Sequence, residues 1–239
     1  MKSPGAAPKI PGPNRPRWSR AVGRFFAYVV WNTRTVGAEL VPPDGAVIIA
    51  SNHLALVDGP LVHGVAPRIT HMLVKEELYR WPLSWLLLAA GQIPVDRRNG
   101  RPALAAALAV LRRGGAIGIF PEGNRGRGDA STARAGTAWL AVYSGAPVVP
   151  VAVLGTRRTG ESVNGLPGLR RRLHVEFGEP VALDLKGLTG RDAVGRAHEL
   201  LRVALQAHVL AVAERAGFAL PADRPEPDSG ELPGGPVRP

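Results

Sequence analysis

Residues 46–58 read AVIIASNHLALVD, an apolar run that leads directly into a histidine and an aspartate five positions apart. The run from Ala46 to Ala50 predicts a buried strand, and open α/β sheets present their reactive groups at the carboxyl ends of strands. Five positions turn roughly 140° around an ideal helix, so a hydrogen bond between His53 and Asp58 requires a turn or a helix start. There the carboxylate would fix the tautomer of the imidazole, as the acidic member of a catalytic triad does. The stretch favours a catalytic base, with a structural histidine as the alternative.

The composition limits the classes of protein to which this chain can belong. The chain has 239 residues, of which 45% are hydrophobic, enough for the core of one α/β domain. It has no cysteine, which excludes disulfides, thiolate nucleophiles and cysteine metal sites. It also has no G-x-S-x-G motif, so an α/β-hydrolase would lack its nucleophile. The net charge of +11 predicts attraction to a polyanion, which leaves open nucleic acid, an anionic lipid surface and a phosphorylated substrate.

Short apolar runs alternate with helical patterns along the chain. Strands are predicted at 36–41, 46–50, 69–74, 92–95, 116–120, 148–154 and 173–177. Helices are predicted at 17–34, 102–113, 136–144 and 192–216. This alternation predicts an α/β fold with a mainly parallel sheet of about seven strands, covered by helices.

The helix predicted at 17–34 is amphipathic, because Trp18, Phe25 and Trp31 are interspersed with arginines such as Arg20 and Arg24. A helix of this kind can lie on a membrane, or it can pack on the domain as an ordinary helix. The periodicity alone leaves both interpretations open.

Proline-rich ends flank the expected domain. Residues 1–16 contain five prolines and residues 221–239 contain six, so both are predicted to be disordered tails around a single domain at 17–220. The longest apolar run, 81–95, is interrupted by Pro82 and Gly91 and falls short of the roughly 18 to 20 residues that span a bilayer. We therefore expect a cytoplasmic protein, peripheral on the inner face of the cell membrane.

Two further strand ends carry charged residues. Glu122 and Arg125 follow the strand 116–120, and Asp96 and Arg97 follow the strand 92–95; either pair can also be plain surface charge. The carboxyl ends of parallel strands meet at one edge, so these groups are expected beside the histidine. A base, cations suited to a phosphate and no nucleophile indicate direct transfer onto a substrate hydroxyl. No histidine or carboxylate spacing predicts a metal site.

Four ordered blocks resemble the signature of the glycerolipid acyltransferases of the 1-acyl-glycerol-3-phosphate acyltransferase type. They are HLALVD at 53–58, GQIPVDR at 91–97, FPEGNR at 120–125 and VVPV at 148–151, within a resemblance that covers residues 17 to 215. Asn124 departs from the family, where threonine is commoner. The resemblance implies His53 as catalytic base with Asp58 as its partner. It implies that the substrates are bound by Lys75, Asp96, Arg97, Glu122, Gly123, Arg125 and, near the acyl donor, Pro150.

The implied reaction moves a fatty acyl group from acyl-CoA or acyl carrier protein to the 2-hydroxyl of 1-acyl-glycerol-3-phosphate, giving phosphatidic acid. The resemblance implies no cofactor and no metal, an anionic membrane as partner, and no nucleic acid. Two alternatives remain at this stage. The acceptor can be the hydroxyl of another lysolipid or of a glycolipid, or the chain can be a basic, RNA-associated polyanion-binding protein.

Overall fold

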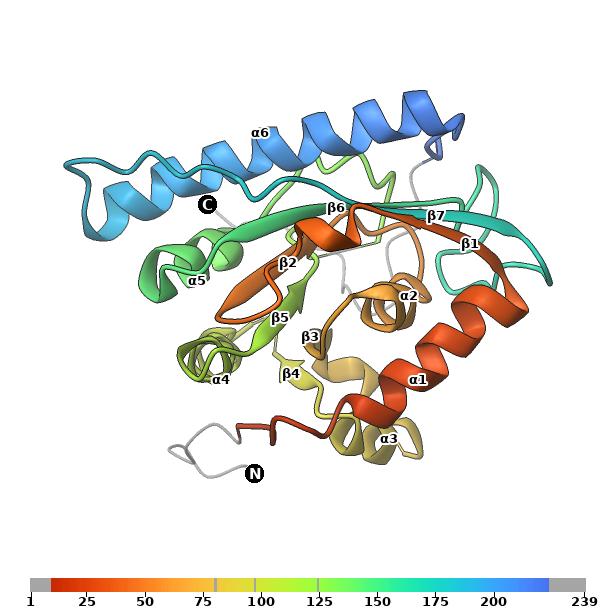
Figure 1. Ribbon diagram of the computed structural model, residues 1–239, viewed down its shortest axis with the longest axis horizontal. Coiled ribbons are helices and arrows are strands. Elements are labelled where there is room, and N and C mark those ends of the chain that lie inside the picture. The colour runs from red at the N-terminus through yellow and green to blue at the C-terminus, as the bar shows by residue number, and fades with distance from the viewer. Residues whose placement is uncertain (1–9, 80, 97, 124, 224–239) are drawn as a thin grey trace, which may run out of the picture.

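A computed structural model describes residues 10–79, 81–96, 98–123 and 125–223 (Figure 1). The strands are β1 (Asn32–Val36), β2 (Val47–Ser51), β3 (Thr70–Lys75), β4 (Ile93–Val95), β5 (Ala116–Ile119), β6 (Val148–Leu154) and β7 (Arg172–Phe177). The α-helices are α1 (Arg17–Phe25), α2 (Asp58–Val65), α3 (Leu83–Ala89), α4 (Arg101–Arg112), α5 (Gly136–Ser144) and α6 (Gly190–Ala216). A π-helix, η1 (Phe26–Val30), continues α1, and η2 (Ala38–Leu40) and η3 (Glu76–Leu78) are short 3₁₀ turns.

The seven strands form one sheet in the order β1-β7-β6-β2-β5-β3-β4. Of the strand pairs in the described ranges, β6 and β7 alone run antiparallel, so the predicted mainly parallel sheet of seven strands is confirmed. Helices α4, α5 and α6 cover one face, and α2 and η1 cover the other, with α1 packed against α2 (Figure 1). The fold is thus a three-layered α/β domain.

The strand β2 lies at the centre of the sheet, between β6 and β5. All five of its residues are buried, because helices cover both of its faces, which explains its uninterrupted apolar sequence. It runs parallel to β5, and β5 runs parallel to β3. The loops that follow β2, β3, β4 and β5 therefore all leave the same edge of the sheet.

Two predicted boundaries near the amino terminus are wrong. The strand predicted at 36–41 is β1 at 32–36, and the helix predicted at 17–34 ends with η1 at Val30. Thr33, Thr35 and Val36 are β-branched, and they pair with β7, a strand about 140 positions away in the sequence. A partner this distant leaves no local signal, so the helical periodicity concealed the strand.

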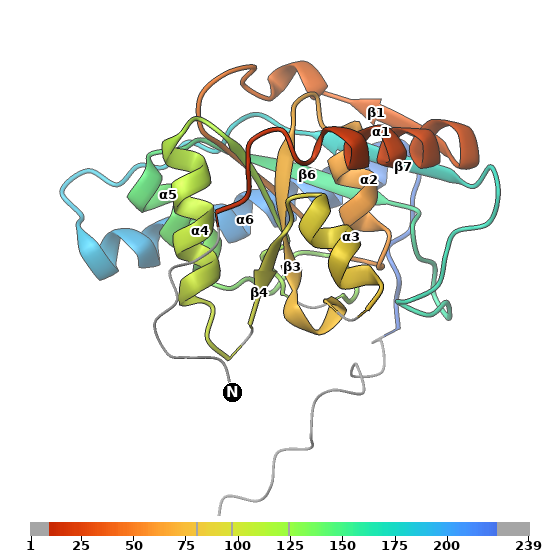
Figure 2. The same ribbon diagram turned by 90° about the horizontal axis from the view of Figure 1, so that it is seen from below.

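Two short helices were not predicted. α2 has eight residues and begins at Asp58, where the sequence predicted only a turn or a helix start. α3 has seven residues within the apolar run 81–95 and lies beside α1 in both views (Figures 1 and 2). Within the described ranges, no helix combines the length and the apolar character needed to cross a bilayer.

Helices α1 and α2 cross with their backbones in contact. Gly23 is buried on α1, and a Cβ atom on Gly64 of α2 would lie 2.4 Å from the carbonyl carbon of Gly23. Two facing glycines permit this approach, because any side chain would force the helices apart. Arg20, which also lies on α1, donates two hydrogen bonds to the carbonyl oxygen of Ala66 at the end of α2.

We expect Gly64→Ala to lower the free energy of unfolding by about 1–3 kcal/mol, because its methyl group overpacks the contact between α1 and α2. Gly195→Ala on α6 is the matched control: no atom lies within 4 Å of its added Cβ, and it should leave stability unchanged or raise it by about 0.5–1 kcal/mol. Denaturant unfolding measures both. Equal stability of Gly64→Ala and the wild type would contradict the contact.

Candidate active site

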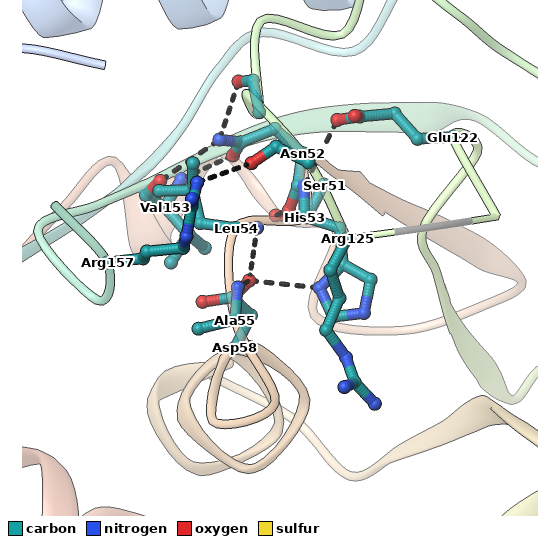
Figure 3. Close-up of polar contacts among 12 residues, drawn as sticks. Ser51, Asn52, His53, Leu54, Ala55, Asp58, Glu122, Arg125, Val153 and Arg157 are labelled. Carbon is teal, nitrogen blue, oxygen red and sulfur yellow. Dashed lines mark hydrogen bonds and ion pairs between the residues drawn. The ribbon is translucent and has the colours of Figure 1, made fainter. Parts of the chain in front are cut away.

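The loop after β2 holds His53 against Asp58. The Nδ1 atom of His53 lies 2.9 Å from Oδ2 of Asp58. The same oxygen accepts the backbone N–H groups of Leu54 at 2.6 Å and Ala55 at 2.7 Å (Figure 3). The fully buried Asp58 opens α2, so a helix start supplies the geometry that five positions on a regular helix cannot. With Nδ1–H donated to the carboxylate, Nε2 of His53 is left as the basic nitrogen.

Phe120 orients the imidazole from one side. Its ring stacks on that of His53 with centroids 4.0 Å apart and planes inclined by 14°. Burial lowers the pKa of His53, and the charges of Arg125 and Lys75 lower it further, whereas the hydrogen bond and charge of Asp58 raise it. The net shift is downward, so the ring is neutral near pH 7 and is able to accept a proton.

Glu122 contacts the loop of the histidine. Its Oε1 accepts the backbone N–H of His53 at 3.1 Å, and the residue does not line the cavity described below (Figure 3). Burial raises the pKa of the Glu122 carboxyl to about 8, and the nearby carboxylates of Asp129 and Asp58 add to this, against the hydrogen bond from His53. The structure thus places Glu122 against the backbone of His53 and outside the cavity lining, whereas the resemblance implied that it orients an arginine or binds the acceptor.

A cavity of about 580 Å³ opens beside His53. Most of its wall is apolar and comes from α1, α3, α4 and the ends of β3 and β5. Four of the predicted substrate-binding residues line it together with His53, namely Lys75, Asp96, Gly123 and Arg125. The structure therefore gathers groups from the ends of four strands around one space.

Two arginines stand in this cavity. Arg125 is buried, its Nη1 donates to Oδ1 of Asn164, and its side chain extends in the same direction as that of His53 (Figure 3). Arg134, which the sequence did not single out, precedes α5 and lies against Gly123: a Cβ on Gly123 would be 2.7 Å from Nε of Arg134. No sequence block contains Arg134, so only the tertiary contact reveals it.

Other candidates lie elsewhere. Pro150 is in the middle of β6 on the face that α5 and α6 cover, and it does not line the cavity, so the structure does not bring it together with the other predicted residues. Arg97 falls outside the described residues. Arg127 is exposed and lies 3.9 Å from Asp129.

The histidines His63 and His71 are buried and satisfied. His63 contacts the hydroxyls of Ser19 and Thr70, each at 2.9 Å, and His71 contacts the carbonyl oxygen of Gly91 at 2.7 Å. Burial lowers the pKa of His63 to about 4. Among the residues that the structure describes, no group of three or more metal-ligating side chains could hold a metal ion.

The fold and the site together define an α/β domain that presents a histidine, paired with a buried aspartate, at a strand end beside a cavity. The model of the Acyltransferase family matches residues 32–154, about half of the chain, and the chain belongs to this family. The match extends from β1 to β6 and includes the cavity residues His53, Lys75, Asp96 and Arg125.

Relatives of this chain are named for two different acceptor lipids. The 1-acyl-sn-glycerol-3-phosphate acyltransferase of Borreliella burgdorferi is 38% identical over 128 residues, which cover 50% of each chain. The chain thus spans about half the length of that relative. The lyso-ornithine lipid O-acyltransferase of Pseudomonas aeruginosa is 28% identical over 222 residues, covering 82% of this chain and 83% of that one.

A solved structure resembles the whole domain. The crystal structure of the 1-acyl-sn-glycerophosphate acyltransferase PlsC from Thermotoga maritima matches with a TM-score of 0.61 and 26% identity. The match covers 84% of this chain and 79% of that one.

We expect the ring of His53 to titrate below pH 6.5, the ordinary value, because burial outweighs Asp58. Asp58→Asn removes the negative charge that raises this pKa and should move the pKa further down. Titration of ¹⁵N-histidine-labelled protein by NMR reads both values. A wild-type pKa above 6.5 would contradict the neutral, buried base.

Proposed function

We propose that this protein transfers a fatty acyl group from acyl-CoA or acyl carrier protein to the 2-hydroxyl of 1-acyl-glycerol-3-phosphate, giving phosphatidic acid for phospholipid synthesis. The observation that carries the proposal is the His53–Asp58 pair at the wall of a largely apolar cavity that also contains Lys75, Arg125 and Arg134. The apolar volume suits acyl chains, and the cations suit a phosphate. The Borreliella relative and the PlsC structure support the same reaction by their names.

In the proposed mechanism, Nε2 of His53 removes the proton of the acceptor hydroxyl as its oxygen attacks the thioester carbonyl carbon. Asp58 stabilises the imidazolium that forms. The tetrahedral intermediate collapses, the C–S bond breaks, and the thiolate takes the proton back from His53 to leave as a free thiol. General-base assistance of this kind contributes about 10²- to 10⁴-fold in rate. The reaction needs no cofactor beyond the acyl donor.

The oxyanion of that intermediate needs a donor. The N–H of Gly123 already donates to the carbonyl oxygen of Phe120 at 3.1 Å. Lys75 lines the cavity and its charge acts on His53, so its ammonium group is a second candidate for the oxyanion.

The acceptor's phosphate is the proposed ligand of Arg125 and Arg134, with Arg97 as a further candidate from the sequence. The Nη1 of Arg125 donates a hydrogen bond to Oδ1 of Asn164. This bond holds the guanidinium in place before the ligand arrives. A preorganised cation limits the entropy lost on binding and holds the hydroxyl near the base.

A second acceptor remains as the alternative. The lyso-ornithine lipid acyltransferase is the relative that matches the greater share of this chain, 82%. The cavity also contains Asp96, a carboxylate that could pair with an ammonium group on such a lipid. The same base and the same donor would then serve another lysolipid hydroxyl.

We further propose that the protein binds the inner face of the cell membrane peripherally through α1, η1 and α3. Trp85 on α3 is 70% exposed, and Trp81, which lies just before α3, is 88% exposed. Trp18 Nε1 donates to the carbonyl oxygen of Ala89 and joins the helices. The arginines of α1 add positive charge toward anionic lipids. Because α1 and α3 also wall the cavity, docking would bring its mouth to the lipid surface.

The reaction is tested with radiolabelled acyl-CoA and acyl carrier protein against a panel of lysolipids. We expect label in phosphatidic acid and a fall in kcat of about 10²- to 10⁴-fold for His53→Ala at an unchanged melting temperature. Label that appears only in the ornithine lipid would show that the acceptor is lyso-ornithine lipid and not 1-acyl-glycerol-3-phosphate. If the His53→Ala protein keeps most of its turnover, His53 is not the catalytic base.

Arg125→Ala and Arg134→Ala should each raise the acceptor KM by about 10- to 100-fold, the cost of a lost charge-assisted hydrogen bond, with a smaller effect on the donor KM. Arg127→Ala removes an equal charge outside the cavity and is the control. Steady-state kinetics give both constants. If all three variants behave alike, the two arginines do not bind the acceptor.

The double variant Trp81→Ala and Trp85→Ala should lower partition onto vesicles that contain phosphatidylglycerol by about tenfold or more, since burying such a side chain contributes about 1.5–3 kcal/mol. Tyr143→Ala is the control, because Tyr143 is an exposed aromatic residue on α5, across the sheet. Vesicle sedimentation measures the partition. Equal binding of the double variant and the wild type would refute the docking surface.

A further inference from the structure

Asn52, which directly precedes His53, is fully buried and does not line the cavity. Its carboxamide bonds to backbone groups. Oδ1 accepts the N–H of Val153 at 2.7 Å, and Nδ2 donates to the carbonyl oxygens of Val153 at 3.0 Å and Gly128 at 2.9 Å (Figure 3). Both amide protons are therefore used, as a buried carboxamide requires.

Two of these bonds extend the sheet. The pairing of β2 with β6 ends at Ser51 opposite Val151. Beyond it, the side chain of Asn52 meets both the N–H and the C=O of Val153, as a peptide group of a neighbouring strand would. The end of β2 is thereby anchored to the rigid strand β6.

The third bond leads to the loop that follows β5, which carries Glu122 and Arg125. This loop is also joined to the loop of the base by His53 N–H to Glu122 Oε1, and by Gly126 N–H to His53 C=O at 3.0 Å. At Gly128 the contact is close: a Cβ there would lie 2.3 Å from Cδ2 of Leu54 and 3.1 Å from Nδ2 of Asn52. Asn52 thus bonds to β6 and to the second loop at once.

We propose that Asn52 is a positioning residue that sets where Arg125 stands relative to His53. Without its Nδ2 donors, the buried carbonyl of Gly128 loses its partner, and the loop after β5 shifts away from the base. A displacement of about 1 Å between positioned groups costs on the order of 10²-fold in rate. The effect on turnover rests on the function proposed above.

Asn52→Asp and Asn52→Ala test this residue. The Asn52→Asp variant keeps an acceptor toward the N–H of Val153 but sets a carboxylate oxygen, which cannot donate, against two carbonyl oxygens. Both variants should lower kcat by about 10²-fold and raise the acceptor KM, with the donor KM within about twofold of the wild type. Circular dichroism fixes a temperature at which each protein is folded.

Val209→Ala is the matched control, because it truncates a fully buried side chain in the packing of α6 on β6, away from the cavity. We expect a lower melting temperature for it with unchanged kcat. If the Asn52 variants lose rate only in proportion to their unfolded fraction, as a merely destabilised protein does, the positioning role is overturned.

A second readout does not depend on turnover. The pKa of the His53 ring, on which Asp58, Arg125 and Lys75 act, should rise toward its ordinary value in Asn52→Ala as water reaches the loosened loop. It should stay unchanged in Val209→Ala. NMR titration measures it. If the wild type transfers no acyl group, the proposed function fails while this titration still decides the role of Asn52. An unchanged His53 pKa in Asn52→Ala would overturn it.

Discussion

Hydrogen bonds between two loops, one after β2 and one after β5, make the site possible. His53 N–H reaches Glu122, Gly126 N–H reaches the carbonyl of His53, and Asn52 reaches Gly128. A histidine at the end of one strand and an arginine at the end of another have no fixed relative position unless direct contacts hold their loops together. Because these bonds are buried or partly buried and involve the backbone, they hold the loops of His53 and Arg125 together as one unit.

The imidazole is constrained from several sides at once. Asp58 fixes its Nδ1, Phe120 stacks on its face, and Glu122 holds its backbone. The aspartate in turn accepts two further N–H groups, so it cannot rotate away from the ring. The result is a neutral imidazole with one basic nitrogen, set at the wall of a largely apolar cavity, which is the arrangement that the proposed transfer to a lipid hydroxyl needs.

The sequence predicted most of the residues that line the cavity, and the residues that it misplaced or did not predict have physical explanations. His53, Lys75, Asp96, Gly123 and Arg125 line the cavity because parallel strands present their carboxyl ends at one edge. Pro150 faces the other side of β6, since neighbouring residues in a strand point to opposite faces and a block of four apolar letters does not say which. Arg134 was not predicted because it lies outside the four blocks, and only the folded loop after β5 brings it against Gly123.

The sequence by itself determined the alternation of strands and helices, the parallel central sheet and the residues at its strand ends. These follow from local patterns: apolar runs, glycine and proline turns, and helical periodicity. Only the tertiary structure decided that β1 pairs with β7, that Glu122 supports the base from behind, and that Asn52 joins the two loops. Each of these depends on contacts between residues roughly 70 to 140 positions apart, and no local pattern encodes such a contact.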